Sequence, residues 1–256
     1  QAFCAAIMAL AQHGDNVVMP SPYYFNHQMW LQMMGIELRL IPSFKNSTAL
    51  PDPADADALI DSRTRAIVLC SPNNPTGATY PPELLMAFLD LAARRGLMLI
   101  VDETYKDFRS DAAPAHRLFA DARWPESLVQ LYSFSKVFAM TGYRVGSLIA
   151  GERVQAEVEK VMDCVAICAP SISQSAALFG LQSLSQWKAA KTAMMAGRRE
   201  ALLSAFSHAG LSYQLASSGA YFAYVRHPFR GETSREVSKR LAQRHDVLCL
   251  PGSMFG

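Results

Sequence analysis

Charged residues are scarce in this sequence. Only 18% of its 256 residues are Asp, Glu, Lys or Arg, and the formal net charge at pH 7 is +2. Lysine and arginine form no run, so the charge pattern gives no support for binding to nucleic acid or to a membrane surface. No stretch contains the roughly 18 consecutive apolar residues that a membrane-spanning helix needs. We therefore expect neither a nucleic-acid partner nor a membrane partner.

Cysteine is also scarce, and its pattern argues against disulfides and metal binding. The number of cysteines is odd, most of them lie in apolar surroundings, and no histidine pair with metal-ligand spacing accompanies them. These features predict reduced thiols in the core of a cytoplasmic protein, with no metal site. The five residues are Cys4, Cys70, Cys164, Cys168 and Cys249.

Apolar residues make up half of the chain, which is enough for a sizeable core. Short apolar runs alternate with helical patterns such as Pro82–Arg95, which has prolines at its start and Arg94, Arg95 and Gly96 at its end. This alternation predicts an α/β fold with a mostly parallel sheet flanked by helices. The predicted strands are Val17–Met19, Glu37–Ile41, Ala66–Cys70, Leu97–Val101, Leu128–Tyr132 and Val145–Ala150.

The pattern changes after Gly151, where helices dominate. We predict a large domain over residues 1–186 and the start of a smaller α+β C-terminal domain over residues 187–256. Neither end of the chain looks like a natural terminus, so we expect the central part of a longer protein. The predicted elements here are helices Glu152–Asp163, Ser173–Leu184, Gln186–Ala209 and Ser234–His245, and strands Ala220–Val225 and Val247–Leu250.

Polar clusters directly follow three of the predicted parallel strands, where ligands collect in such sheets. Tyr24 and His27 follow the first strand, and Asn74 lies in a turn stiffened by two prolines and a glycine. Asp102 and Tyr105 follow a buried strand, where a carboxylate is costly unless it meets a cation or hydrogen-bond donors. Taken singly, these clusters also fit loop aromatics, a plain turn and a strand-end cap.

A fourth cluster surrounds Lys136, which follows the strand Leu128–Tyr132. A lysine amine that is partly desolvated near other cations can lose its proton and form a Schiff base, although a solvated loop lysine fits equally well. Ser133 and Arg144 offer charge-assisted bonds to a phosphate. Together, the four clusters supply the amine, carboxylate, amide, phenol, aromatic face and phosphate clamp that pyridoxal phosphate needs.

These clusters resemble the motifs of the class I/II aminotransferases, within the fold-type I pyridoxal-phosphate superfamily that includes aspartate aminotransferase. The resemblance lies in the Asn-Pro-Thr-Gly turn at Asn74, the Asp-x-x-Tyr strand end at Asp102 and the Ser-x-Ser-Lys run ending at Lys136, with Arg144 eight residues later. It covers essentially the whole chain. It implies transamination of an amino acid with a 2-oxo acid through a lysine Schiff base, and a homodimer.

The resemblance also implies roles for individual residues. Lys136 would form the Schiff base and later carry the proton, and Asp102 would pair with the protonated ring nitrogen. His27 would lie behind Asp102 and orient it. Asn74 and Tyr105 would bond to the oxygen of the ring hydroxyl.

The remaining roles concern the phosphate and the ring face. Ser133 and Arg144 would hold the phosphate, with Ser135 as a further candidate, and Tyr24 would stack on the ring. The family's small phosphate-binding turn is expected just before Gln1, and its arginine for the substrate carboxylate just after Gly256. Both therefore fall outside this sequence.

Other activities remain open. A carbon-sulfur β-lyase, a decarboxylase of an amino-acid phosphate or a cyclopropane-forming synthase would use the same lysine and aspartate. A regulator whose aminotransferase-like domain only senses the cofactor is another alternative. The Ser-Phe-Ser-Lys run followed by Thr-Gly-Tyr-Arg favours transamination. The motifs do not identify the amino-acid substrate.

Overall fold

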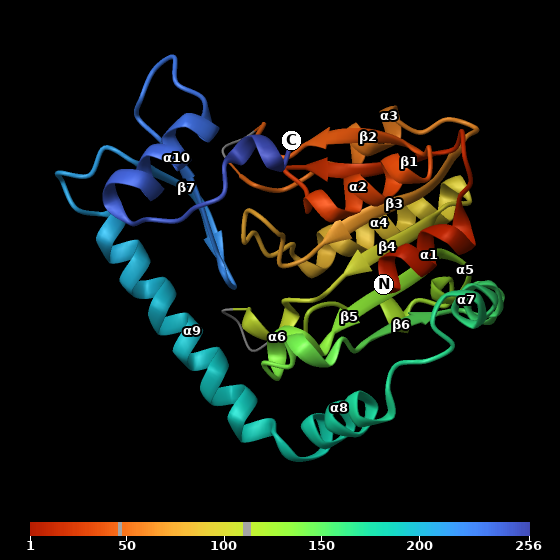
Figure 1. Ribbon diagram of the computed structural model, residues 1–256. Helices are drawn as coiled ribbons and strands as arrows, with labels where there is room; N and C mark the ends of the chain where they lie inside the picture. Colours follow the sequence, from red (N-terminus) through yellow and green to blue (C-terminus); the bar gives the residue numbers. More distant parts are fainter. Residues whose placement is uncertain (46–47, 110–113) are drawn as a thin grey trace.

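A six-stranded sheet forms the centre of the molecule (Figure 1). The computed structural model describes residues 1–45, 48–109 and 114–256. The strands lie in the order β2-β1-β3-β4-β5-β6, and all neighbours pair in parallel except β6, which is antiparallel to β5. The predicted α/β class is confirmed. The strands are β1 (Asn16–Ser21), β2 (Glu37–Pro42), β3 (Thr64–Cys70), β4 (Met98–Asp102), β5 (Leu128–Ser133) and β6 (Gly146–Ala150).

Two apolar cores cover the two faces of this sheet. Val17 and Met19 of β1 belong to one core, and Val18 between them belongs to the other, because successive strand side chains point to opposite faces. Burial on both faces explains the continuous apolar runs from which the strands were predicted. Helices α1 (Ala2–Leu10), α2 (Phe25–Met33) and α7 (Glu152–Val165) contribute to the first core, and α3 (Pro53–Ala58), α4 (Pro82–Arg95) and α5 (Trp124–Ser127) to the second.

Helix α4 has the bounds that its end signals predict. It begins at Pro82, where the missing N–H needs no partner, and Glu83 lies in its first turn. Arg94 and Arg95 lie in the last turn, where cations interact favourably with the helix dipole. Gly96 then adopts the left-handed conformation (φ 66°) that ends the helix.

The C-terminal part consists of helices and a two-stranded hairpin. The helices are α8 (Ser171–Ser183), the long α9 (Ser185–Phe206) and α10 (Ser234–His245), and β7 (Gln214–Gly219) pairs antiparallel with β8 (Phe222–Arg226). In Figure 1, α9 runs from α8 toward this hairpin and α10. Strand β7 was not predicted, because its Ala-Ser-Ser-Gly stretch carries little apolar alternation.

The predicted strand Val247–Leu250 is wrong. These residues form no regular element, and the side chain of Leu248 is 88% exposed. A strand exists only where a neighbouring strand takes up its backbone hydrogen bonds, and β7 and β8 pair only with each other within the described residues. Apolar and β-branched residues are therefore not sufficient to form a strand.

The hairpin contacts the turn after β3 through two glycines. A Cβ atom on Gly219, at the end of β7, would lie 2.2 Å from the carbonyl oxygen of Gly77 in the turn after β3. A Cβ on Gly77 would lie 2.3 Å from the Gly219 nitrogen, and Gly77 also has a positive φ of 71°. Only glycine permits two backbones to approach so closely.

The segment between β5 and β6 leaves the sheet and returns to it. It contains a short helix α6 (Phe134–Val137) and a 3₁₀ turn η3 (Thr141–Tyr143), and it closes where Ser133 pairs with Gly146. A separate apolar cluster holds the segment in place. Its buried members here are Phe134, Val137, Phe138, Met140 and Val145.

The prediction that the cysteines are core thiols needs correction. Cys70 is buried and Cys4 partly so, but Cys164, Cys168 and Cys249 are exposed, although all five are free thiols. Cys164 and Cys168 flank the end of α7, where apolar neighbours in the sequence do not ensure burial. In the described ranges, no helix is both long and apolar enough to span a bilayer.

Candidate active site

A cavity of about 240 Å³ opens at the carboxyl ends of β3, β4 and β5. Eight of the nine predicted site residues line it, although they come from four separate segments of the sequence. They are Tyr24, Asn74, Asp102, Tyr105, Ser133, Ser135, Lys136 and Arg144. The ninth, His27, contacts Asp102. The parallel strands bring the segments together because their carboxyl ends meet at one edge of the sheet.

Asp102 is the anion of this cavity. Its Oδ1 accepts hydrogen bonds from the Thr104 backbone nitrogen (3.0 Å) and the Thr104 hydroxyl (2.7 Å), and its Oδ2 lies 3.3 Å from His27 Nε2. Burial raises the pKa of Asp102, but the bonds and charge from His27 and the bonds from Thr104 outweigh it and hold the pKa below its usual range. The carboxylate is therefore ionised near neutral pH.

His27 is fixed from behind by an aromatic ring. It is 4% exposed, and its ring stacks on Phe3 of α1 with centroids 4.0 Å apart. The side chain comes from α2, which begins at Phe25 directly after the loop that follows β1. This stacking restricts the orientation in which the imidazole meets Asp102.

The two adjacent asparagines of the turn after β3, Asn73 and Asn74, make different contacts. Asn73 is 3% exposed, and its Oδ1 accepts from the Thr76 nitrogen (3.1 Å) and the Thr76 hydroxyl (2.8 Å). The Gly77 nitrogen also donates to the Asn73 carbonyl at 2.7 Å. Asn73 holds the turn together, and Asn74 lines the cavity.

Two phenols lie near Asp102. Burial raises the pKa of Tyr105, nearby Cys70 and Asp102 raise it further, and a hydrogen bond with the Asn74 side chain partly opposes this. Burial also raises the pKa of Tyr24, as do Asp102 and Cys70. Both side chains are consequently neutral phenols over the ordinary pH range, able to donate a proton in a hydrogen bond.

The cations Lys136 and Arg144 come from the segment between β5 and β6. Phe134 and Val137 are buried on either side of Lys136, and Lys136 itself lines the cavity. Ser133 Oγ accepts from the Ser135 nitrogen at 3.3 Å, which caps α6. Arg144 adopts a left-handed backbone conformation (φ 53°) directly after η3. An amine, a guanidinium and two hydroxyls thus share one cavity with a carboxylate.

Three residues of the cavity were not predicted: Cys70, Thr104 and Thr141. The sequence places Cys70 among the predicted core thiols, and Thr141 within the Thr-Gly-Tyr-Arg run without a role of its own. Thr104 lies two residues after Asp102, a spacing at which a hydroxyl and a carboxylate meet in a turn. That spacing was a usable signal in the sequence.

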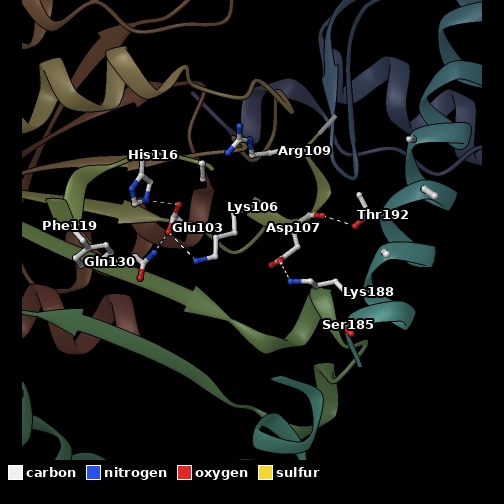
Figure 2. A pocket seen from close by; sticks show the side chains of 14 residues that line it. Glu103, Lys106, Asp107, Arg109, His116, Phe119, Gln130, Ser185, Lys188 and Thr192 are labelled. Carbon is white, nitrogen blue, oxygen red and sulfur yellow. Dashed lines mark hydrogen bonds and ion pairs between the residues drawn. The ribbon is translucent and has the colours of Figure 1, made fainter. Parts of the chain in front are cut away.

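A larger cavity of about 930 Å³ lies between the segment after β4 and helix α9 (Figure 2). Its carboxylates already have partners. Glu103 lies 3.0 Å from His116 Nε2 and 3.4 Å from Lys106 Nζ, and it also accepts from Gln130. Figure 2 shows this group beside a second one, in which Asp107 lies 3.1 Å from Lys188 of α9.

The Asp107 group joins three elements of the fold. Asp107 Oδ2 accepts from the Tyr132 hydroxyl of β5 at 2.5 Å, and its carbonyl accepts from the Thr192 hydroxyl of α9 at 2.7 Å. These contacts fasten α9 to the end of β5, just before Ser133. We interpret this cavity as a junction between elements, since its charged groups neutralise one another.

Comparison with known proteins identifies relatives over the whole chain. Residues 1–256 match the family described as aminotransferase class I and II. The chain is 30% identical to an aromatic aminotransferase of Arabidopsis thaliana, covering 100% of this chain and 65% of that protein. It is also 30% identical to an aspartate aminotransferase of Pyrococcus horikoshii, covering 98% of this chain and 64% of that protein. The chain thus spans slightly less than two thirds of the length of these relatives.

Solved structures show the same fold. A Thermus thermophilus aspartate aminotransferase mutant superposes with a TM-score of 0.90 at 27% identity, covering 99% of this chain and 69% of that one. The aspartate aminotransferase of Thermotoga maritima also gives a TM-score of 0.90 at 27% identity, covering 99% and 66% of the two chains.

Proposed function

The chain belongs to the aminotransferase class I and II family, and we propose that it binds pyridoxal phosphate and transfers an amino group between an amino acid and a 2-oxo acid. Members of this family depend on pyridoxal phosphate. The observation that carries the proposal is that Lys136 and Asp102 line one cavity, although 33 residues of chain separate them.

The cavity has the groups that this cofactor requires. When bound, pyridoxal phosphate supplies an aldehyde that links to amines and a cationic ring that stabilises negative charge on the adjoining carbon. Asp102, kept ionised by its donors, would hold the proton on the ring nitrogen. His27 would keep the carboxylate turned toward that nitrogen, and Tyr24 would cover one face of the ring.

The other residues would hold the cofactor's substituents. Asn74 and Tyr105, which line the same cavity, would donate to the ring hydroxyl oxygen and stabilise its negative charge. Arg144 would supply a forked, charge-assisted grip on the phosphate, and the Ser133 and Ser135 hydroxyls would add single bonds.

Lys136 would have two tasks in sequence. Its amine would hold the cofactor by a covalent bond to the aldehyde, formed with loss of water. When free, the same amine would act as a general base that takes the proton from the substrate's Cα and then as the general acid that returns it.

We also propose that residues 1–186 form the cofactor-binding domain and residues 187–256 the beginning of the smaller one. Support comes from α9, which starts at Ser185 directly after α8 and runs from there toward the hairpin. We further propose a cytoplasmic homodimer. The exposed apolar side chains of α8, Ile172, Leu178, Phe179 and Leu181, support self-association.

Trapping of the cofactor tests the proposed function. The purified protein is incubated with pyridoxal phosphate, reduced with borohydride, digested and mapped by mass spectrometry. We expect the label on Lys136, none on Lys136→Ala, and unchanged labelling in Lys188→Ala, a control in the other cavity. A label on another lysine, or none, contradicts the proposal. A screen of amino donors with one 2-oxo acid then measures the transfer itself.

A further inference from the structure

We propose that the Thr104 hydroxyl is a positioning group for Asp102, which holds one oxygen of the carboxylate so that the anion is fixed for the ring nitrogen of the cofactor. The identity of that ring rests on the proposed function. The contact between Thr104 and Asp102 does not depend on it.

The geometry separates the hydroxyl from the backbone. Both Thr104 donors reach the same oxygen: the nitrogen lies 3.0 Å and the hydroxyl 2.7 Å from Asp102 Oδ1. Any residue except proline can supply the backbone N–H at position 104, so the second donor is the specific contribution of a hydroxyl side chain. Thr104 also lines the cavity, so this bond lies at its wall.

The two oxygens of the carboxylate are held from opposite sides. His27 Nε2 faces Oδ2 at 3.3 Å, and Thr104 occupies Oδ1. A carboxylate with donors on both oxygens cannot rotate without breaking at least one bond. Without the hydroxyl, the backbone bond alone would restrain Oδ1.

The hydroxyl also favours the ionised form of Asp102. A buried carboxylate is stable as an anion only if its donors replace the lost hydration. The hydrogen bond from the Thr104 side chain is one of the contributions that lower the pKa of Asp102. The other titratable or charged groups around Asp102 are His27 of α2, Tyr24 before α2, Cys70 at the end of β3, Tyr105 after β4, and Lys136 and Arg144 on the cavity wall.

This contact has a consequence for cofactor binding in acid. A protonated Asp102 cannot act as the anion for the ring nitrogen, so the affinity for the cofactor should fall as the pH drops through the Asp102 midpoint. Each donor that favours the anion shifts this fall to lower pH. Thr104 therefore extends the pH range of binding downward.

The first test needs no cofactor. Carboxyl-labelled aspartate is followed by NMR in the empty protein as the pH is lowered, with Asp102→Asn identifying the Asp102 signal. In Thr104→Val, which keeps the shape but lacks the hydroxyl, we expect the midpoint to move upward. In Thr104→Ser, which keeps the hydroxyl, it should stay at the wild-type value. An unchanged Thr104→Val midpoint, or an equal shift in both variants, overturns the inference.

The second test measures pyridoxal phosphate affinity over the same pH range by quenching of tryptophan fluorescence. In Thr104→Val, we expect the affinity to be lower by roughly tenfold on the acid side, the effect of one lost hydrogen bond to a charged group, with little change near neutral pH. Thr104→Ser should follow the wild type. If the affinity of all variants for the cofactor falls at the same pH in acid, the Thr104 inference fails. If none binds it, the proposed function fails, and the NMR midpoints decide the Thr104 contact separately.

Discussion

Replacement of Gly219 by alanine should disturb the cofactor site from a distance. Gly219 lies at the end of β7, and its backbone touches Gly77 in the turn that carries Asn74. A Cβ at position 219 would lie 2.2 Å from the Gly77 carbonyl oxygen, well inside van der Waals contact. The obstacle is backbone on both sides, so a side-chain rotation cannot relieve it.

The size of the effect follows from this overlap. The hairpin and the turn must separate by about 1 Å, and overpacking of this kind costs typically 1–3 kcal/mol. The unfolding temperature of a chain of this size falls by roughly 2–4 °C for each kcal/mol. The turn moves as a unit, because Gly77 N donates to the Asn73 carbonyl and Asn73 also binds Thr76. Asn74 therefore moves with it, and we expect pyridoxal phosphate affinity to fall about tenfold, as for one lost hydrogen bond.

The matched control is Gly197→Ala in α9. A Cβ at Gly197 meets nothing within 4 Å, and alanine is the better helix former. Thermal unfolding and fluorescence titration with the cofactor compare the two variants. If Gly219→Ala matches Gly197→Ala in both measurements, the hairpin does not position the turn, and the reasoning is refuted.

Three further predictions concern the carboxylates. Asp102→Ala should lower turnover at least a hundredfold, with an unchanged circular dichroism spectrum; near-normal turnover would contradict its proposed role at the ring nitrogen. Burial raises the pKa of Glu103, but the hydrogen bond from His116 and nearby positive charge outweigh it, so the pKa is lowered. The ionised Glu103 side chain stabilises the fold fully above its ordinary pKa of 4.5, and this stabilisation is lost as the pH falls through its lowered pKa. Glu103→Gln should therefore make the free energy of unfolding, measured in denaturant, less dependent on pH in acid. Asp107→Asn should weaken the attachment of α9 by about 0.5–1 kcal/mol, and a double-mutant cycle with Lys188→Ala that shows no coupling would contradict this.

Much of the architecture could be predicted because strands buried on both faces of the sheet appear in the sequence as continuous apolar runs. The strand predictions lie within two residues of β3 and β5, most of whose side chains are buried. Helices α4 and α10 have the predicted bounds because each carries its own end signals, such as the capping box of Thr233 and Glu236. The gathering of strand-end residues at one cavity followed from the rule for parallel sheets.

The remaining features depend on contacts between distant segments. Strand β7 is held by pairing with β8 and shows little alternation of its own, and Val247–Leu250 lacks a neighbouring strand within the described residues. The exposure of Cys164 depends on which side of α7 meets the sheet. Only the structure shows that Asn73 forms the hydrogen bonds within the turn while Asn74 lines the cavity.

The return of the chain from β5 to β6 has a consequence for length variation. The pairing of Ser133 with Gly146 fixes both ends of this excursion, and Lys136 and Arg144 lie near its two ends. The length of this segment between β5 and β6 therefore sets the distance between the Lys136 amine and the Arg144 guanidinium. A single inserted codon would move one of them out of place or force the strand pairing to slip. Loops at the opposite ends of the strands hold neither of these two side chains, so insertions there should leave the separation of Lys136 from Arg144 unchanged.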